Sequence, residues 1–504
     1  MHTFADPLRR AVQIAPTKTA IIAGAARFTF ADFQNRCARL VGALRSLGLQ
    51  HGDRVAILAA NGNEYLETYV GVPAGGLVVV PLNTRHAESE LEYALKDSGT
   101  KVLLTDRDPG MLGGAVDNVI LIPDEYEPTL AAAEPVALGA GISEDDLAGL
   151  FYTGGTTGLS KGVMLSHRNL IANTFHWLSA ARQREDDHFL IVAPLFHAAG
   201  SNAVLGCIWN TTCQTTLAAF DPDAALDLIE QRGITQLLVV PTMLAAMTES
   251  QHANPRNVDS LQFIAHGGSP VATEVLRRSH SAFPGARLIE VYGATELSPL
   301  ATMLDGEEQL MDQPQARSCG RAIPGNEVRI LNTEGEEVAR GEVGEVVVRG
   351  PNVMQGYWNK PEQTEAVLKD SGYWTGDLGY MDAEGYLFLV DRSKDMIISG
   401  GENVYSTEVE EVLYKHPAVL EAAAFGVPDD KWGEAVWAAI VPRAEHGSVD
   451  AAKIIEFCKQ HIAGYKVPKG VDIRQEPLPK SGPGKVLKRE LRAPYWEGRR
   501  RGVN

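Results

Sequence analysis

Short runs of aliphatic and β-branched residues alternate with longer amphipathic stretches over most of the chain. Residues 55–58 and 237–240 are two such runs. This alternation is typical of βαβ units, which build parallel sheets. One helix is predicted to run to about Arg232, because Asp221 suits the N-cap and Pro222 the first helical position. The pattern therefore predicts an α/β fold for the body of the chain.

The pattern changes twice towards the C-terminus. Between residues 341 and 390, short strands alternate with glycine turns, which predicts a small antiparallel β subdomain. After residues 391–395 a helix is expected to begin at Thr407-Glu408-Val409-Glu410, which has the pattern of a capping box. Two strand-like runs, 419–425 and 435–441, follow around a turn. We therefore predict a C-terminal α+β domain of about a hundred residues.

Length and charge narrow the classes of protein. A chain of 504 residues exceeds what one hydrophobic core usually organises, so several domains are expected. The apolar share of 44% and the charged share of 22% fit a globular protein. A net charge of −18 argues against a nucleic-acid partner, because binding a phosphate backbone needs concentrated Lys and Arg.

The cysteines and the apolar stretches indicate the cellular compartment in which the protein is expected. The five cysteines are scattered and form no C-x-x-C pair, so we expect neither a disulfide framework nor a zinc site, and a reducing cytoplasm fits. Residues 1–6 lack the pattern of a signal peptide. The longest apolar stretch, 70–82, contains Gly and Pro and is shorter than the ~20 residues of a spanning helix. We expect no integral membrane segment; peripheral membrane contact stays open, as does the choice between monomer and homodimer.

The strongest chemical signal is a segment rich in Gly and Thr that contains a lysine. Its glycines allow backbone N–H groups to approach an anion, its threonines offer hydroxyl donors, and its lysine adds a positive charge. The residue order differs from a Walker A loop. A surface loop without a ligand is the alternative interpretation of this segment alone. The segment is Tyr152-Thr153-Gly154-Gly155-Thr156-Thr157-Gly158-Leu159-Ser160-Lys161-Gly162.

This segment resembles the phosphate-binding signature Y-T-S-G-T-T-G-x-P-K-G of the acyl-adenylate-forming (AMP-binding) superfamily. Gly154 stands in place of Ser and Ser160 in place of Pro, so one possible triphosphate contact is missing. Further motifs follow in family order from about residue 50 to residue 492. The resemblance implies a large N-terminal domain, 1–393, and a C-terminal lid domain, 395–504, joined by a hinge at Lys394. An ordinary linker lysine is the alternative interpretation of Lys394.

The resemblance also implies a nucleotide site. It places Tyr292 on adenine, Thr295 at the α-phosphate and Glu296 on Mg²⁺; the preference of Mg²⁺ for a carboxylate plus phosphate oxygens independently supports Glu296. Asp377 can accept both ribose hydroxyl protons, and Arg392 can donate from a planar fork. The other residues assigned to the nucleotide are Thr153, Gly154, Gly155, Thr156, Thr157, Lys161, Gly268, Ser269, Gly293 and Ala294.

Four residues are expected to carry the chemistry by resemblance: Lys485, Glu296, His197 and Thr295. Lys485 lies in residues 479–492, which resemble the C-terminal P-x-x-x-x-G-K-x-x-x-x-x-L-R motif. His197 ends a motif found beside the acyl carboxylate, although a single His is more often a satisfied core residue. Attack of a carboxylate on the α-phosphate needs a metal and a cation more than a base. Rotation about the hinge would then withdraw Lys485 and bring in coenzyme A.

The expected function is an ATP-dependent carboxylic acid–CoA ligase that uses ATP, Mg²⁺ and coenzyme A. The pantetheine arm is expected at Gly400 and Gly401, and the acyl pocket at Ala199, Gly200 and Gly293. Family members that use acetate have a Trp where Gly293 stands, so the pocket is expected to be open. Residues 197–208 and 292–304 contain no Lys or Arg, which disfavours a dicarboxylate. A medium- or long-chain fatty acid is therefore expected, with an aryl acid such as a hydroxycinnamate as the alternative.

Three other functions remain alternatives. A stand-alone amino-acid adenylation domain usually has an Asp near the His motif, and residues 196–200 contain none. Luciferase-like light emission has no feature in its favour. A catalytically silent nucleotide-binding regulator would require the loss of Lys485, Glu296 or Asp377, and all three are present.

Overall fold

A computed structural model of the chain divides into two compact units. The first consists of Met1–Val328 with Val348–Tyr373, and the second of Arg329–Val347 with Trp374–Asn504. The domain boundary expected near Lys394 stays a prediction. The structure describes residues 3–153, 160–269, 271, 273–400, 402–429, 431–443, 449–480 and 486–497.

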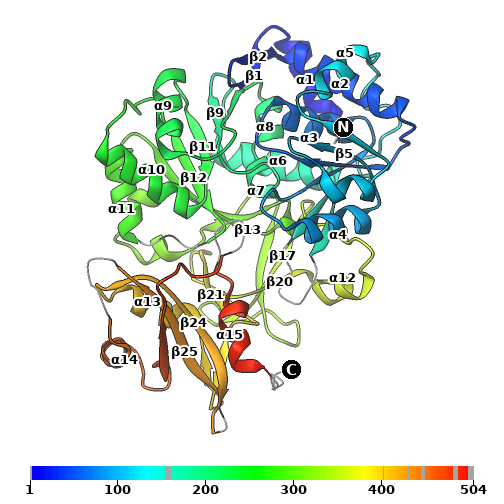
Figure 1. Cartoon of the computed structure of the whole chain (residues 1–504). Helices are drawn as coiled ribbons and strands as arrows, with labels where there is room; N and C mark the ends of the chain where they lie inside the picture. Colours follow the sequence, from blue (N-terminus) through cyan, green and yellow to red (C-terminus); the bar gives the residue numbers. More distant parts are fainter. Residues whose placement is uncertain are drawn as a thin grey trace. The chain divides into compact units, whose positions relative to one another are not determined.

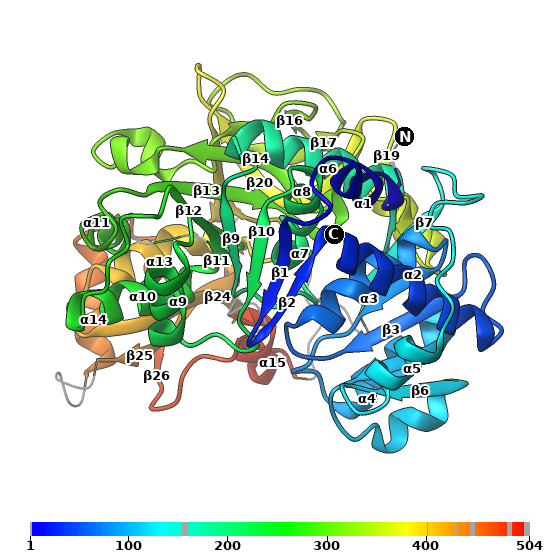
Figure 2. The same cartoon turned by 90° about the horizontal axis from the view of Figure 1, so that it is seen from above.

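The first unit contains two mainly parallel sheets, as the alternating sequence pattern predicts. The strands of one sheet are β1 (Thr19–Ala23), β2 (Ala26–Thr29), β9 (His188–Ile191), β10 (Cys213–Thr216), β11 (Gln236–Val239), β12 (Phe263–Gly267), β13 (Arg287–Gly293), β14 (Leu300–Asp305) and β15 (Arg321–Ala322). Their order is β15-β14-β13-β12-β11-β9-β10-β1-β2. The pairs from β1 through β10, β9, β11 and β12 to β13 are parallel, while β2, β14 and β15 pair antiparallel at the edges. Figure 2 shows the β1–β2 pair continuing the sheet beyond β10.

Three helices pack beside the central strands of this sheet: α9 (Pro222–Arg232), α10 (Pro241–Ala253) and α11 (Thr273–Ala282), which lie next to β11 and β12 in Figure 1. Their buried side chains, such as Leu226, Leu244 and Leu276, form one hydrophobic cluster with the strands. Burial of such a side chain contributes roughly 1.5–3 kcal/mol. The Asp221 side chain accepts a hydrogen bond of 2.8 Å from the Ala224 N–H, which confirms the predicted N-cap of α9.

The other sheet of this unit has the order β18-β8-β7-β4-β3-β5-β6. Its strands are β3 (Arg54–Leu58), β4 (Val78–Pro81), β5 (Thr100–Thr105), β6 (Asn118–Leu121), β7 (Leu147–Thr153), β8 (Lys161–Ser166) and β18 (Gly356–Tyr357). Strands β3 to β7 pair in parallel, and β8 and β18 are antiparallel to their neighbours. The remaining helices of the unit are α1 (Ala5–Ile14), α2 (Phe30–Ser46), α3 (Asn63–Ala74), α4 (Glu88–Ser98), η1 (Gly110–Ala115), α5 (Tyr126–Ala132), α6 (His167–Ala181), α7 (Ala198–Ser201), α8 (Val204–Trp209), η2 (Thr295–Leu297), η3 (Glu307–Gln309), η4 (Pro314–Arg317) and α12 (Pro361–Val367). In Figure 1, β5 lies between α2 and α5 on one side and α4 on the other.

A third sheet overlaps the region, 341–390, where short strands and glycine turns are expected, and its first strand precedes that region. It consists of β16 (Glu327–Leu331), β17 (Gly344–Arg349), β19 (Leu368–Lys369), β20 (Gly372–Met381) and β21 (Leu387–Arg392). The order is β16-β17-β20-β19, and β21 pairs with β20. The β19–β20 and β20–β21 pairs are antiparallel, which confirms the small antiparallel sheet.

The C-terminal part is α+β, as predicted. Its elements are β22 (Ile397–Ser399), β23 (Glu402–Val404), α13 (Ser406–Tyr414), β24 (Val419–Asp429), β25 (Gly433–Pro442), α14 (Ala451–Lys459), β26 (Gly470–Ile473) and α15 (Lys488–Trp496). The strand order is β23-β22-β25-β24, with β26 parallel to β25. Helices α13 and α14 pack on this sheet through a cluster that includes Val409, Leu413 and Ile454. Among the described residues, no helix is long and apolar enough to cross a membrane.

The predicted capping box of α13 is wrong. The helix begins at Ser406, and its N-cap residue, Tyr405, makes no side-chain capping bond. The Thr407 hydroxyl instead donates to the carbonyl oxygen of Val390. The Glu410 carboxylate accepts from the Ala424 N–H at 2.8 Å. Both side chains of the expected box are therefore used for tertiary contacts.

Candidate active site

The residues predicted to contact adenine lie at the carboxyl ends of two neighbouring parallel strands, β12 and β13. Gly267 on β12 is paired with Val291 on β13. Gly268 follows with a φ of 88°, a left-handed conformation that favours glycine, and precedes Ser269. Tyr292 is nearly buried, with 9% of its surface exposed. Ligands of open α/β sheets bind at this end of the strands, so the arrangement fits the prediction.

Glu296, the predicted Mg²⁺ residue, lies in η2 directly after β13. Its Oε1 accepts a hydrogen bond of 2.8 Å from the Tyr357 hydroxyl. The Lys161 Nζ lies 4.6 Å from the centroid of the same tyrosine ring, within the range of a cation–π contact. Tyr357 thus brings together two residues that the sequence assigns to the nucleotide. It was missed by sequence reasoning.

The Tyr357 phenol is held in its neutral form. Burial raises the pKa of Tyr357 well above its usual value, and the charge and hydrogen bond of Glu296 act in the same direction. A neutral phenol can donate a hydrogen bond, whereas a carboxylate such as that of Glu296 can only accept one. The hydrogen bond therefore fixes one oxygen of Glu296 in orientation.

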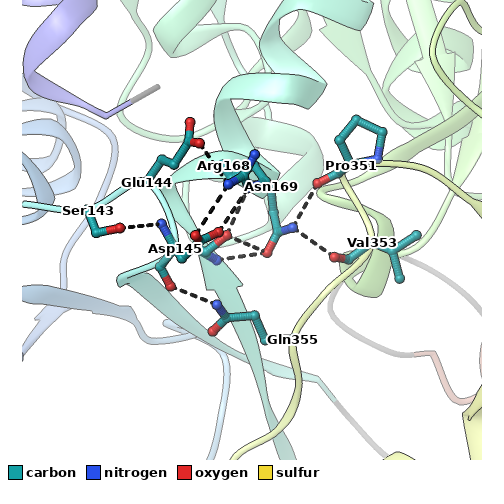
Figure 3. A network of polar contacts seen from close by, with 9 residues as sticks. Ser143, Glu144, Asp145, Arg168, Asn169, Pro351, Val353 and Gln355 are labelled. Carbon is teal, nitrogen blue, oxygen red and sulfur yellow. Dashed lines mark hydrogen bonds and ion pairs between the residues drawn. The ribbon is translucent and has the colours of Figure 1, made fainter. Parts of the chain in front are cut away.

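Figure 3 shows a polar network that holds the segment before Tyr357 in place. The side-chain amide of Asn169, near the start of α6, donates to the carbonyl oxygens of Pro351 and Val353, each at 2.8 Å. The Gln355 amide donates to the carbonyl oxygen of Asp145 at 2.8 Å. Arg168 pairs with the side chains of Asp145 at 2.9 Å and Glu144 at 2.7 Å. The network secures β18, and hence Tyr357, beside β8, which carries Lys161.

The predicted phosphate segment begins and ends on the antiparallel pair β7–β8, where Thr153 lies opposite Lys161. The Tyr152 hydroxyl donates to Asp97 Oδ2 at 2.7 Å, which anchors the end of β7 to α4. Four residues assigned to the nucleotide lie outside the described residues: Gly154, Gly155, Thr156 and Thr157.

His197 precedes α7 and is largely buried. Its ring lies 4.4 Å from that of Phe196, centroid to centroid. Its Nε2 is buried, and no described residue forms a hydrogen bond with it. Burial lowers the pKa of His197 to about 4, and the charges of Arg85 and His86 act in the same direction. The imidazole is therefore neutral near pH 7, and its unpaired Nε2 suits a ligand's polar group.

The two segments predicted to form the acyl pocket are connected through Asn173 of α6. Its Oδ1 accepts from the Leu300 N–H at 3.1 Å, and its Nδ2 donates to Asn202 Oδ1 at 2.6 Å. Asn202 follows α7, which contains Ala199 and Gly200. Asn173 thus joins the segment after His197 to the segment after Gly293.

Both glycines of the predicted acyl pocket are needed where two backbone segments approach closely. A Cβ at Gly293 would lie 1.8 Å from the carbonyl oxygen of Pro299, which also accepts a hydrogen bond of 2.9 Å from the Ala294 N–H. A Cβ at Gly200 would lie 2.0 Å from the carbonyl oxygen of Pro194. The backbone therefore accounts for these glycines, and their assignment to the pocket stays a prediction.

In the second unit, β20 and β21 place Asp377 opposite Arg392. The Arg392 Nε lies 3.2 Å from Asp377 Oδ1. The predicted hinge residue, Lys394, follows closely and is half-buried. Burial lowers the pKa of Lys394 to about 8, and Arg392 contributes in the same direction. Its carbonyl oxygen accepts from Arg492 Nη1 at 3.3 Å. Lys394 is therefore unlike a fully solvated linker lysine.

Gly400 of the predicted coenzyme A segment has a φ of 63° and lies against Trp432. Its N–H donates to the Trp432 carbonyl oxygen at 2.8 Å, and a Cβ would approach the indole ring to 2.6 Å. Gly401 and Lys485 lie outside the described residues.

The donor set fits a metal ion that is bound partly by substrate. No group of three or more His, Cys, Asp or Glu residues in the described part of the chain could hold a metal ion. Mg²⁺ usually takes one or two carboxylates and completes its shell with phosphate oxygens and water. Glu296, oriented by Tyr357 near Lys161, suits that mode of binding.

Comparison with known proteins finds similarity along nearly the whole chain. The model of the AMP-binding enzyme family matches residues 8–358, and that of the AMP-binding enzyme C-terminal domain matches residues 408–485. A feruloyl-CoA synthase from Amycolatopsis sp is 40% identical over 493 residues, which cover 96% of this chain and 97% of that protein. A long-chain-fatty-acid–CoA ligase from Bacillus subtilis is 34% identical over an alignment that covers 94% of this chain and 91% of that protein. The structure of ATP-bound MatB from Rhodopseudomonas palustris matches with a TM-score of 0.90 and 31% identity, over 98% of this chain and 100% of that chain.

Proposed function

The chain belongs to the AMP-binding enzyme family, and on this premise we propose that it is an ATP-dependent ligase that joins an aryl acid to coenzyme A through an acyl-adenylate. The observation that carries the ligase proposal is the convergence of Lys161 and Glu296 on Tyr357. The preference for an aryl acid rests on the 40% identity to a feruloyl-CoA synthase over nearly the whole chain. The expected fatty acid is the second candidate, supported by the 34% identity to a long-chain-fatty-acid–CoA ligase.

The first half-reaction would place the acid's carboxylate in line with the α-phosphate of ATP. Bound Mg²⁺ would neutralise charge on the phosphates, with Glu296 as its protein ligand. Lys161 would contact phosphate oxygens, Thr295 the α-phosphate, and Lys485 both the carboxylate and the α-phosphate. These groups act by position and charge, so no general base is required.

The proposed nucleoside contacts fall into an adenine group and a ribose group. Gly268, Ser269 and Tyr292 would contact the adenine at the ends of β12 and β13. The Asp377 carboxylate can accept hydrogen bonds from both ribose hydroxyls while Arg392 holds it by charge. We assign the remaining nucleotide contacts to Thr153, Gly154, Gly155, Thr156, Thr157, Gly293 and Ala294.

Two further groups of residues would contact the acid and coenzyme A. The neutral His197 would offer its unpaired Nε2 as a hydrogen-bond partner beside the acid, and Ala199, Gly200 and Gly293 would border the acyl chain. In the second half-reaction, rotation at Lys394 would bring Gly400 and Gly401 to the pantetheine arm.

The test combines the purified protein with ATP, Mg²⁺ and coenzyme A and a panel of acids that includes ferulate and a saturated long-chain fatty acid. AMP, pyrophosphate and an acyl-CoA should form in equal amounts. The kcat/KM for ferulate should exceed that for the fatty acid by about tenfold or more. ADP as the product would exclude an adenylate mechanism, whereas a preference for the fatty acid would overturn only the aryl assignment.

A further inference from the structure

A buried cluster of charged and polar side chains connects three elements of the second unit. The Ser406 hydroxyl donates to Asp391 Oδ1 at 3.0 Å, and the Ser406 N–H donates to Asp391 Oδ2 at 2.5 Å. The same hydroxyl accepts from Lys488 Nζ at 2.5 Å. Lys488 Nζ also pairs with Glu410 Oε1 at 2.7 Å. The four side chains form a continuous chain of polar contacts from β21 through α13 to the start of α15.

These residues lie on both sides of the predicted hinge in the sequence. Asp391 precedes Lys394 by three positions, whereas Ser406, Glu410 and Lys488 follow it. A second contact across the same point joins the Thr407 hydroxyl to the Val390 carbonyl oxygen. Rotation of the backbone at Lys394 would therefore separate Asp391 from Ser406 and Lys488.

The contacts are costly to break because the groups are buried. Asp391 is 6% exposed and the Lys488 side chain 13% exposed. Burial raises the pKa of Asp391, and the nearby Lys488 charge opposes this effect. Although burial lowers the pKa of Lys488, the charges of Glu410 and Asp391 outweigh it and raise the pKa overall. Lys488 thus compensates two buried carboxylates, and a buried charge that loses its partner is strongly destabilising.

Lys488 is also close to the proposed catalytic residue along the chain. It stands three positions after Lys485 and is the first residue of α15. Further along the same helix, Arg492 Nη1 donates to the Lys394 carbonyl oxygen and lies 3.8 Å from Asp395 Oδ1. Helix α15 therefore contacts the hinge directly and is joined through Ser406 to the strand before it.

We propose that Lys488 is a positioning residue for the ligase reaction: its contacts with Ser406 and Glu410 hold Ser406 against Asp391 and so favour one of the two arrangements of the hinge. This inference rests on the proposed function and on rotation at Lys394. The half-reaction that uses the linked arrangement needs the contact, while the other half-reaction requires its release. As a positioning residue, Lys488 would act without touching the reacting atoms.

The experiment measures the two half-reactions separately. Acid-dependent exchange of pyrophosphate into ATP without coenzyme A reports adenylate formation, and synthetic acyl-AMP with coenzyme A reports thioester formation. Lys488→Met should change the ratio of the two rates by roughly three- to thirtyfold, the range of coupling through such contacts. Lys488→Arg, which keeps the charge, should restore most of the original ratio.

Two further variants separate positioning from loss of stability. Ser406→Ala removes the hydroxyl that joins Lys488 to Asp391 but leaves the Ser406 N–H bond to Asp391 and the Lys488–Glu410 pair, so it decides the question if Lys488→Met does not fold. The matched control is Lys466→Met. It breaks an ion pair of 2.6 Å to Glu408, which lies on α13 like Ser406 and Glu410. Both Lys466 and Glu408 follow the hinge in the sequence. The control should leave the ratio unchanged.

Equal changes in both half-reactions for Lys488→Met and Ser406→Ala would overturn the proposal, as would a shift of the same size for Lys466→Met. Failure of the unmutated protein to form either acyl-AMP or acyl-CoA would instead count against the proposed function.

Discussion

The hydroxyl of Tyr357 donates a hydrogen bond to Oε1 of Glu296 over 2.8 Å, although the two residues stand far apart in the sequence. The tyrosine ring also lies under the Lys161 ammonium. One side chain therefore orients the proposed metal-binding carboxylate and a proposed phosphate-binding cation at once.

Tyr357→Phe should weaken the use of MgATP while retaining the ring beneath Lys161. A hydrogen bond to a charged group contributes about 1.5–3 kcal/mol, so kcat/KM for MgATP should fall by about ten- to a hundredfold. Steady-state kinetics at several Mg²⁺ concentrations measure the effect. Tyr380→Phe is a suitable control, since Tyr380 stacks on Phe388 with ring centroids 4.9 Å apart and should keep that contact. An unchanged dependence on Mg²⁺ in Tyr357→Phe would contradict the proposal that Tyr357 orients the metal-binding carboxylate of Glu296.

Lys485→Ala should impair adenylate formation by ~10²–10³-fold, as the loss of other preorganised electrostatic groups does. The charge is needed only while the carboxylate and the α-phosphate come together, so thioester formation from supplied acyl-AMP should proceed at near the original rate. Loss of both half-reactions to the same extent would make Lys485 a structural residue.

Gly293→Ala should destabilise the protein as well as reduce its activity. The added methyl group would meet the Pro299 carbonyl oxygen at 1.8 Å, so the backbone must move. Such overpacking costs about 1–3 kcal/mol, which a denaturant titration can measure. Gly114→Ala is the control, because its methyl group would have no neighbour within 4 Å. A larger residue at position 293, such as Trp, would also displace the backbone of Pro299. Its effect on the accepted acyl-chain length would therefore combine a filled pocket with a changed backbone.

Acid should destabilise the protein partly through His197. Its pKa is about 4 in the folded chain, below the usual value of 6.5, so the unfolded chain binds the proton more readily. Stability is therefore unaffected by this group above pH 6.5 and is lost as the pH falls from 6.5 to 4. His197→Asn should make the decline between pH 7 and pH 5 less steep, as measured by denaturant midpoints. An identical decline in both proteins would contradict a neutral, buried His197.

Local sequence signals predicted the fold well where the structure depends on neighbours in the chain. Asp221 and Pro222 start α9 as expected, and the alternating pattern yielded the parallel sheets. The phosphate segment and the Glu296 motif identified the class of enzyme, an acid–CoA ligase, which the family and its relatives confirm.

Features that depend on distant pairing escaped prediction. Tyr357 reaches Glu296 only because β18 pairs with β8, and nothing near residues 356–358 signals that pairing. The capping box at Thr407 failed because its hydroxyl is used by Val390. The close approach of the Pro299 carbonyl oxygen to Gly293 was likewise not predicted.

The contacts of Asp391 and Val390 have a practical consequence for dividing the protein or exchanging parts with relatives. A cut at Lys394 would leave Asp391 in one piece and Ser406, with its partner Lys488, in the other. The isolated C-terminal piece would then lack the Asp391 carboxylate that accepts from Ser406, although Lys488 would keep its pair with Glu410. A hybrid enzyme joined before Trp374 keeps these partners from the same parent, and so should express as a better-folded protein than one joined at Lys394.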